Sequence, residues 1–337
     1  MTDAAEPASR PRHRPVVPTG RDEAPPASVT PGPIAVLPEA SPAFTAAVER
    51  GGGTVGPLSP ATRGIVWTAA SDAGALRDLL EAHPDVSWVQ LPWAGVDAFA
   101  ELFARFRHDG RAWTSAKGAY AQPVAEHALM LALSLARLLP QRVTARTWQA
   151  DEAGRTLYGS DVVIVGAGGI AVELLRLLEP FGVQATVVRR RPQPVAGAHR
   201  TIAVSELGSA LEHAEVAFVA AALTPESRGL IGPAELARMP HGALLVNVAR
   251  GALVDTDALV DALESGRLGG AGLDVTDPEP LPDGHPLWTA PNCIVTPHVA
   301  DTEAMTVPLF AERIARNTRA FLGDGRFEGR IDLVAGY

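Results

Sequence analysis

Cysteine is almost absent from the 337-residue sequence, in which Cys293 is the only one. A single thiol excludes an internal disulfide framework and fits a reducing compartment, so we expect a cytoplasmic protein. Lysine is as rare, with Lys117 alone, and the formal net charge is −9. An acidic chain gives no electrostatic reason to expect a nucleic-acid partner.

Long apolar runs are lacking as well. No uninterrupted apolar stretch has the length needed to cross a bilayer, so we expect no membrane partner. Residues 1–32 are rich in proline, alanine and arginine without apolar periodicity, which indicates a disordered tail. This tail has no apolar core of the kind that a signal peptide requires. The rest of the chain is long enough for one or two domains.

The segment 161–191 carries the clearest pattern in the chain. A β-branched run predicts a buried parallel strand over residues 162–165. Apolar residues at helical spacing predict a helix over 170–178, and a second apolar run predicts a strand over 185–188. The turn that joins the first strand to the helix contains Gly166, Gly168 and Gly169.

This order of strand, glycine turn, helix and strand is typical of dinucleotide binding. Gly166 would permit the tight turn, and Gly168 would let a pyrophosphate approach the backbone at the helix N-terminus. Ala171 replaces the third glycine of the fingerprint and still allows close packing of the helix on the strand. The alternative is a glycine turn in some other α/β protein.

Strands and helices also alternate before this segment. The predicted strands cover 34–37, 64–67, 86–91 and 112–115, and the predicted helices cover 44–50, 75–83 and 97–107. Such alternation predicts a parallel sheet covered on both faces, here a small flavodoxin-like domain without a glycine fingerprint. A helix is predicted over 124–139, and we expect it to lie between the two sheets. It is apolar around most of its circumference, which indicates a domain connector or a dimer helix.

Three polar residues follow predicted strands in the second half, where open α/β sheets place their sites. Arg250 follows a strand over 243–248, Glu279 a strand over 270–275, and His298 a strand over 294–296. A nicotinamide enzyme that reduces a 2-oxo acid needs an arginine to grip the carboxylate. It also needs a histidine to exchange a proton with the carbonyl oxygen and a carboxylate to orient that histidine. Each residue alone could instead be a surface ion pair, a capping residue or a loop solvator.

The remaining predicted elements complete a second α/β unit. They are a strand over 216–221 and helices over 206–213, 233–239, 256–265 and 303–322.

The sequence resembles the D-isomer-specific 2-hydroxyacid dehydrogenase family. The stretches that carry this resemblance are residues 222–232, 239–282 and 285–300, with weaker matches at 91–99 and 120–129. The family's fold implies a Rossmann dinucleotide-binding domain plus a smaller flavodoxin-like substrate domain, both with parallel sheets. The implied division gives residues 33–117 and 299–337 to the substrate domain and 118–298 to the NAD(P)-binding domain. Two such chains would form a homodimer.

The resemblance also implies residue roles. Arg250, Glu279 and His298 would be catalytic, and the backbone N–H groups of Ala94 and Gly95 would help to hold the substrate carboxylate. The cofactor site would comprise Gly166, Gly168, Gly169, Ile170, Thr224, Val248, Ala249 and Asp274, with Asp274 bonding the nicotinamide amide. No metal site is expected.

Arg189 departs from the NAD pattern. It falls where NAD enzymes carry the acidic residue that binds the ribose 2′-hydroxyl, and Arg190 and Arg191 follow it. Positive charge there suits a 2′-phosphate, so we expect NADP to be favoured over NAD. The alternative is a solvated basic loop that still accepts NAD.

The activity expected from this set is NAD(P)-dependent hydride transfer to or from a small 2-oxo or 2-hydroxy acid. Glyoxylate, hydroxypyruvate and 3-phosphoglycerate are substrates of the expected type. A nucleotide-sensing, corepressor-like binding protein with the same fold is the alternative.

Overall fold

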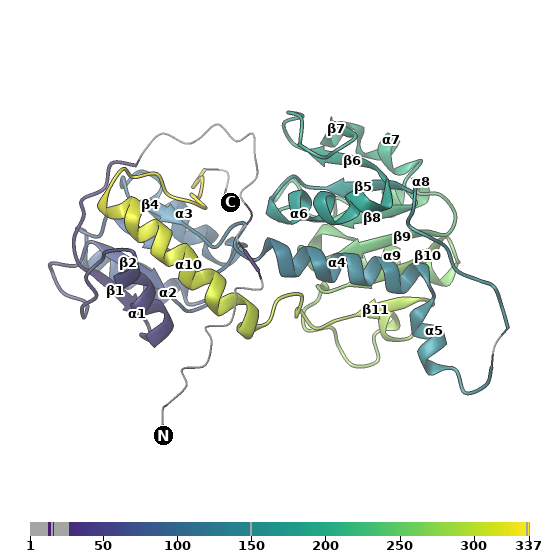
Figure 1. Ribbon diagram of the computed structural model, residues 1–337, viewed down its shortest axis with the longest axis horizontal. Coiled ribbons are helices and arrows are strands. Elements are labelled where there is room, and N and C mark those ends of the chain that lie inside the picture. Colours follow the sequence, from purple (N-terminus) through teal and green to yellow (C-terminus); the bar gives the residue numbers. More distant parts are fainter. Residues whose placement is uncertain (1–12, 15, 17–26, 149, 335, 337) are drawn as a thin grey trace, which may run out of the picture.

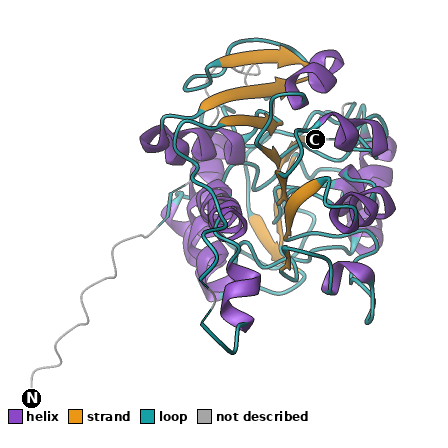
Figure 2. Cartoon of the chain, turned by 90° about the vertical axis from the view of Figure 1, so that its right-hand side faces the viewer, coloured by secondary structure: helices purple, strands orange, loops and turns teal. Residues whose placement is uncertain are grey.

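Two parallel sheets side by side organise the computed structural model, which describes residues 13, 14, 16, 27–148, 150–334 and 336 (Figure 1). One sheet has four strands and the other has seven. Helices lie on both sides of the strands when the molecule is viewed along its long axis (Figure 2). The expected α/β class with two parallel sheets is therefore confirmed.

The small sheet has the strand order β1-β2-β3-β4. Its strands are β1 (Ile34–Leu37), β2 (Gly64–Trp67), β3 (Trp88–Gln90) and β4 (Ala112–Thr114). Val55 adds a parallel bridge to Ile34 beyond the β1 edge, a pairing that sequence reasoning missed because a run of glycines surrounds it. With Val55 counted as the second strand, the order becomes the 2-1-3-4-5 order of flavodoxin-like sheets.

The helices of the small sheet are α1 (Pro42–Arg50), α2 (Ala73–Ala82), α3 (Ala100–Phe106) and α10 (Glu303–Leu322). A 3₁₀ turn, η1 (Asp97–Phe99), replaces the first turn of the helix expected over 97–107. The last helix, α10, comes from the far end of the chain and packs against α1. The rings of Phe44 and Phe310 meet edge to face with their centroids 5.1 Å apart.

The large sheet has the order β11-β10-β9-β8-β5-β6-β7, with every pair parallel. Its strands are β5 (Asp161–Val165), β6 (Gln184–Arg189), β7 (Arg200–Ala203), β8 (Val216–Val219), β9 (Ala243–Asn247), β10 (Leu268–Leu273) and β11 (Cys293–Val295). The chain reverses its direction of travel across the sheet between β5 and β8, and ligands bind at such a switch point. Sequence reasoning missed β7, a short edge strand in which Ile202 is the only buried residue.

The helices of the large sheet are α4 (Ala121–Ala136), α5 (Leu139–Thr144), α6 (Gly169–Leu178), α7 (Leu207–Leu211), α8 (Pro233–Arg238) and α9 (Thr256–Glu264). Four 3₁₀ turns accompany them: η2 (Glu179–Phe181), η3 (Val204–Glu206), η4 (Gly251–Leu253) and η5 (Pro286–Trp288).

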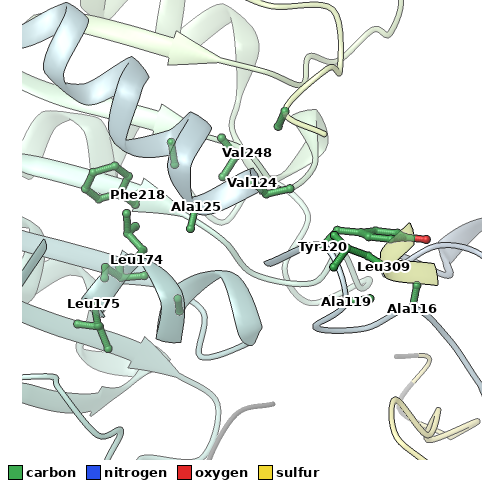
Figure 3. Packing of buried hydrophobic residues seen from close by; sticks show 14 of the residues in the cluster. Ala116, Ala119, Tyr120, Val124, Ala125, Leu174, Leu175, Phe218, Val248 and Leu309 are labelled. Atoms are coloured by element: carbon green, nitrogen blue, oxygen red, sulfur yellow. The ribbon is translucent and has the colours of Figure 1, made fainter. Parts of the chain in front are cut away.

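The long apolar helix differs from expectation in two respects. The single helix expected over 124–139 is wrong at its end, because α4 stops at Ala136 and Leu138 takes the left-handed conformation, with φ 53°. The helix also covers a face of the large sheet instead of lying between the two sheets. A Cβ added to Gly272 of β10 would lie only 2.9 Å from the Leu131 side chain. Figure 3 shows Ala125 near Phe218 of β8 and Leu174 of α6.

The disordered tail expected over residues 1–32 falls mostly outside the described residues. The described part is not disordered: Ala27 N–H donates to the Gly325 carbonyl at 3.0 Å, and Thr30 exchanges two hydrogen bonds with the Ser87 hydroxyl. Ala27 and Val29 also pack against the hydrophobic core. The prediction is therefore wrong for residues 27–32, which backbone pairing holds against the small-sheet unit.

Candidate active site

Three loops converge where β9, β10 and β11 end, because these strands are neighbours and run in parallel. The loop after β9 carries Arg250, the loop after β10 carries Glu279, and the loop after β11 carries His298. Adjacent parallel strands bring their carboxyl ends to one edge of the sheet, so residues far apart in sequence become neighbours.

His298 and Glu279 form a direct pair. The distance from His298 Nδ1 to Glu279 Oε1 is 2.7 Å, and both side chains are partly exposed. Nε2 of His298 has no hydrogen-bond partner within the described part of the chain. The carboxylate therefore fixes the ring orientation through Nδ1 and leaves Nε2 to exchange a proton with a ligand.

Asp274 holds the backbone that carries His298. Its buried carboxylate accepts hydrogen bonds from Val299 N–H at 2.9 Å, Ala300 N–H at 3.0 Å and the Thr296 hydroxyl at 2.6 Å. His298 has φ 53°, a left-handed conformation that a residue with a side chain adopts only when its surroundings enforce it. The expected bond from Asp274 to a nicotinamide amide stays a prediction, and the observed contacts give Asp274 a positioning role.

His127 of α4 extends this network, and sequence reasoning missed it. Its Nε2 lies 3.0 Å from the Thr296 hydroxyl oxygen. The hydroxyl hydrogen is directed to Asp274, so His127 Nε2 must be the donor in its bond to Thr296. There was little reason in the sequence to assign His127 to the site, because an isolated histidine on an apolar helix is usually a satisfied core residue.

Arg250 joins the two sheets at this edge. Its Nε and Nη2 atoms each lie 3.1 Å from Asp97 Oδ1, and Nη1 donates to the Ala249 carbonyl at 2.8 Å. Asp97 belongs to the small-sheet unit and begins η1. Sequence reasoning missed this ion pair because its partners are separated by 153 positions in the chain.

Gly95 lies against the same guanidinium. A Cβ at residue 95 would approach Arg250 Nη2 to 1.7 Å, so any larger residue there would displace the guanidinium from its observed position. The structure thus brings Gly95, with its neighbour Ala94, to the side chain expected to share a carboxylate with them.

Gly251 joins the Arg250 loop to the Glu279 loop. A Cβ at residue 251 would lie 2.0 Å from the Thr276 carbonyl, so this glycine allows the backbone of the Arg250 loop to pack directly against the backbone at Thr276. Thr276 N–H in turn donates to Glu279 Oε2 at 3.3 Å. The arginine loop and the glutamate loop therefore support each other.

The glycine turn stands at the end of β5, as expected. Gly166 has φ 115°, and a Cβ there would lie 2.4 Å from the Ala220 carbonyl. Gly168 is the N-cap of α6, and Gly169 and Ile170 form its first turn. The first N–H groups of a helix lack intrahelical acceptors, so this end can donate to a phosphate.

The other residues expected at the cofactor site follow neighbouring strands. Thr224 lies after β8, and its N–H donates to the Ser227 hydroxyl at 2.8 Å. Val248 and Ala249 follow β9, where the buried Asn247 side chain accepts from Ala249 N–H and donates to the Arg250 carbonyl. Thr224 therefore lies at the switch point between β5 and β8, and Val248 and Ala249 lie one strand further along the same edge of the sheet.

The arginines after the second fingerprint strand lie at its exposed end. Arg189 is the last residue of β6, one position later than expected for the strand end, and its Nη1 donates to the Gln193 carbonyl at 3.3 Å. Arg190 interacts electrostatically with Glu226, a residue that sequence reasoning missed. The pKa of Glu226 is lowered by its own backbone N–H, by the Thr224 hydroxyl and by Arg190.

The described residues contain neither a candidate metal site nor a candidate membrane span. No group of three or more histidine, cysteine, aspartate or glutamate side chains in that part of the chain could hold a metal ion. No helix within the same residues is long and apolar enough to cross a membrane.

Comparison with known proteins identifies the class. The family model described as D-isomer specific 2-hydroxyacid dehydrogenase, NAD binding domain, matches residues 128–300. An uncharacterized protein of Corynebacterium melassecola is 36% identical over 269 residues, which are 78% of this chain and 88% of that protein. Human glyoxylate reductase/hydroxypyruvate reductase is 35% identical over 206 residues, which are 59% of this chain and 63% of the human protein.

Solved structures agree with these matches. A D-isomer specific 2-hydroxyacid dehydrogenase from Xanthobacter autotrophicus Py2, in complex with NADPH and MES, has a TM-score of 0.78 and 28% identity, and the match covers 91% of this chain and all of that one. An NADPH-dependent glyoxylate/hydroxypyruvate reductase from Sinorhizobium meliloti has a TM-score of 0.69 and 25% identity, covering 91% and 98%.

The chain belongs to the D-isomer specific 2-hydroxyacid dehydrogenase family. It is an enzyme, an oxidoreductase that uses NAD or NADP. The alignment with the human reductase spans slightly less than two thirds of that relative's length. The alternative of a nucleotide-sensing binding protein gains no support from these matches.

Proposed function

We propose that this enzyme reduces a short 2-oxo acid to the 2-hydroxy acid and prefers NADPH as the hydride source. The observation that carries the proposal is the arrangement at the strand ends. His298 is oriented by Glu279 at 2.7 Å, while Arg250 reaches from the large-sheet unit to Gly95 and Asp97 of the small-sheet unit. This arrangement supplies a proton donor and a carboxylate grip, the two groups that the reduction requires.

The proposed division of the chain follows the two sheets. Residues 33–117 and 299–337 would form the substrate domain, and residues 118–298 the nucleotide domain. The crossing into α4 supports this division, because Arg313 of α10 donates to the Ser115 carbonyl at 2.6 Å and the Lys117 carbonyl at 2.9 Å. The buried guanidinium thereby ties the last helix to the segment where the chain passes from one sheet to the other.

The glycine turn fits a dinucleotide. A side chain at residue 166 would collide with the Ala220 backbone, and the α6 N-terminus offers N–H groups to a pyrophosphate. Gly166, Gly168, Gly169 and Ile170 would hold that group, with Thr224, Val248, Ala249 and Asp274 lining the rest of the site. When bound, the reduced nicotinamide supplies the hydride.

The enzyme's own residues would bind the substrate carboxylate and supply the proton. Arg250 uses Nε and one Nη2 hydrogen on Asp97 and one Nη1 hydrogen on Ala249, so each terminal nitrogen keeps one hydrogen for the substrate carboxylate. Gly95 and Ala94 present backbone beside that pair. His298 Nε2 would give its proton to the carbonyl oxygen as carbon 2 accepts the hydride, and Glu279 would stabilise the imidazolium before transfer.

The activity is tested by following oxidation of NADPH and of NADH with glyoxylate, hydroxypyruvate and 3-phosphohydroxypyruvate. Turnover of at least one of these acids is expected. No turnover with any of them, by a protein that binds the dinucleotide, would overturn the proposed function.

Arg189 and Arg190 are proposed to favour the 2′-phosphate of NADPH. A charge-assisted pair with a phosphate is stronger than a neutral hydrogen bond. We expect a higher kcat/KM for NADPH than for NADH, and a reversed order in the double variant Arg189→Asp with Arg190→Ser. Both ratios are to be measured at one ionic strength, because salt screens exposed charges. A wild-type preference for NADH would show that the arginines form a solvated loop.

We also propose a cytoplasmic homodimer. Large apolar side chains are exposed along α4, α5 and the segment that follows, as expected of a surface covered by a second copy. They are Met130, Leu139, Val143 and Trp148, of which Trp148 is 95% exposed. Light scattering should give twice the chain mass for the wild type and a shift toward the monomer for Val143→Asp with Trp148→Ser.

The single cysteine fits a reducing cytoplasm.

A further inference from the structure

Asp274 accepts hydrogen bonds from three consecutive backbone N–H groups of the turn that carries His298. Its carbonyl oxygen accepts from His298 N–H at 2.8 Å, and its carboxylate accepts from Val299 N–H at 2.9 Å and Ala300 N–H at 3.0 Å. These bonds hold His298 at φ 53°, in the left-handed region that residues with a side chain rarely occupy. The orientation of the Asp274 carboxylate therefore sets the position of the His298 backbone and of the proposed proton donor.

The orientation of this carboxylate is supported from outside the turn. The terminal torsion of an aspartate is broad, so the carboxylate has no single preferred plane of its own. The Thr296 hydroxyl donates to Asp274 Oδ1 at 2.6 Å. His127 Nε2 lies 3.0 Å from that hydroxyl oxygen and 3.5 Å from Oδ1. Thr296 belongs to the same segment as the turn, whereas His127 belongs to α4, so His127 ties the network to a separate element.

The packing of α4 on the large sheet brings His127 to this place. Leu131 follows His127 by about one helical turn and lies on the same face. A Cβ added to Gly272 would lie 2.9 Å from the Leu131 side chain, so α4 approaches β10 closely there. Gly272 precedes Asp274 by two residues, a rise of about 6.6 Å along a strand. The rise from His127 to Leu131 is about 6 Å, which brings the imidazole over Asp274.

His127 acts as a donor in a part of the site that water hardly reaches. The hydroxyl hydrogen of Thr296 is directed to Asp274, so the hydrogen between Thr296 and His127 must be on Nε2. The His127 side chain is 15% exposed and that of Asp274 is 1% exposed. Without this donor, the hydroxyl oxygen would be left short of a partner in a desolvated place, which is costly. The turn that is joined to Thr296 would then be free to shift.

We propose that His127 is a positioning residue for the reduction, which anchors the turn of the proton donor to α4. It acts through Thr296 and Asp274 on the position of His298, and not on the substrate itself. This inference rests on the proposed function, in which His298 transfers the proton. A misplacement of about 1 Å can cost on the order of 100-fold in rate. Loss of His127 should therefore lower kcat and leave KM, which depends on Arg250, nearly unchanged.

Three substitutions isolate the contact. His127→Leu removes the donor at a similar volume, His127→Gln keeps an N–H group close to the position of Nε2, and Thr296→Val removes the hydroxyl at a similar shape. Leu131→Ala is the matched control, since Leu131 is fully buried on the same face of α4 and has an apolar side chain. The measurements are kcat and KM for the preferred 2-oxo acid at saturating NADPH, melting temperature, and hydrogen exchange of the backbone amides of residues 298–300.

We expect His127→Leu to lower kcat by roughly 5- to 50-fold with KM within about threefold of the wild type, and His127→Gln to keep kcat within about threefold. The amides of residues 298–300 should exchange at least about fivefold faster in His127→Leu. Leu131→Ala should lower the melting temperature through a cavity while kcat stays within about threefold. When Thr296→Val is already present, His127→Leu should change kcat by less than about threefold, because both substitutions break the same contact.

Wild-type kcat in His127→Leu, or an equal loss of kcat in Leu131→Ala, would overturn the inference. An undiminished effect of His127→Leu in the presence of Thr296→Val would overturn it as well. A wild type inert toward every 2-oxo acid would instead overturn the proposed function. Hydrogen exchange needs no turnover, so in that case unchanged exchange at residues 298–300 in His127→Leu would show that His127 does not anchor the turn either.

Discussion

At the scale of single residues, Arg250 is placed by contacts from both sheets. Asp97 holds one edge of its guanidinium and the Ala249 carbonyl holds another, so the side chain is fixed before a substrate arrives. A fixed guanidinium loses less conformational entropy when it binds a carboxylate. Asp97 is therefore a positioning residue in this account.

Substitutions of Arg250 and Asp97 should raise KM to different degrees. Arg250→Ala removes the grip, so KM for the 2-oxo acid should rise at least about tenfold and kcat should fall as well. Asp97→Asn keeps the shape but weakens the hold on Arg250, so KM should rise about 3- to 10-fold with a smaller change in kcat. Steady-state kinetics checks both variants. Wild-type KM in Asp97→Asn would show that the ion pair is dispensable.

Glu279 should act through charge. Glu279→Gln keeps an oxygen that can accept from His298 Nδ1 but removes the negative charge at 2.7 Å from the ring. The protonated ring then loses a stabilising partner, so reduction should fade at a lower pH than in the wild type. The pH profile of kcat/KM tests this. An unmoved profile would leave Glu279 with only a structural role in its loop.

The sequence predicted Arg250, Glu279 and His298 because each follows a strand, and that rule needs only local pattern. It could not predict Asp97 or His127. Their partners lie on distant segments, and such contacts follow from how the two sheets face each other.

At the scale of elements, strong apolar periodicity was sufficient for the central strands and for the last helix, whose bounds match the expectation of 303–322. Where the apolar periodicity was weak, the elements were not predicted. The edge strand β7 and the bridge at Val55 have few buried side chains. They are held by backbone hydrogen bonds, so the sequence has no hydrophobic pattern that would predict them. The break at Leu138 also lacks a glycine or proline at the position that turns.

The segment 27–32 gives an element-scale prediction. A chain lacking residues 1–26 should melt above one lacking residues 1–32, because only the second loses the Ala27 and Thr30 hydrogen bonds and the packing of Val29. Each kcal/mol shifts the melting temperature by about 1–2 °C in a chain of this size, because the unfolding entropy is roughly 2.1 cal/mol/K per residue. Scanning calorimetry compares the two. Equal melting temperatures would show that the segment contributes no stability.

At the scale of the whole molecule, the chain builds one sheet, crosses to the second at residues 115–118, and returns after His298 to add α10 to the first (Figure 1). Sequence order alone would place α10 with the large sheet. The resemblance to a known family placed it with the small one, because a returning helix leaves no local signal. The site therefore lies between two units that the chain links twice, with Arg250 on one and Gly95 on the other.

The central claim is that His298 donates the proton in the reduction proposed for this site. The most direct measurement compares the wild type with His298→Ala, using turnover of the preferred 2-oxo acid and fluorescence titration of NADPH. The account predicts that kcat falls by roughly 10²–10⁴-fold while Kd for NADPH is unchanged, since His298 is not among the residues proposed to bind the dinucleotide. Wild-type turnover in His298→Ala would contradict it.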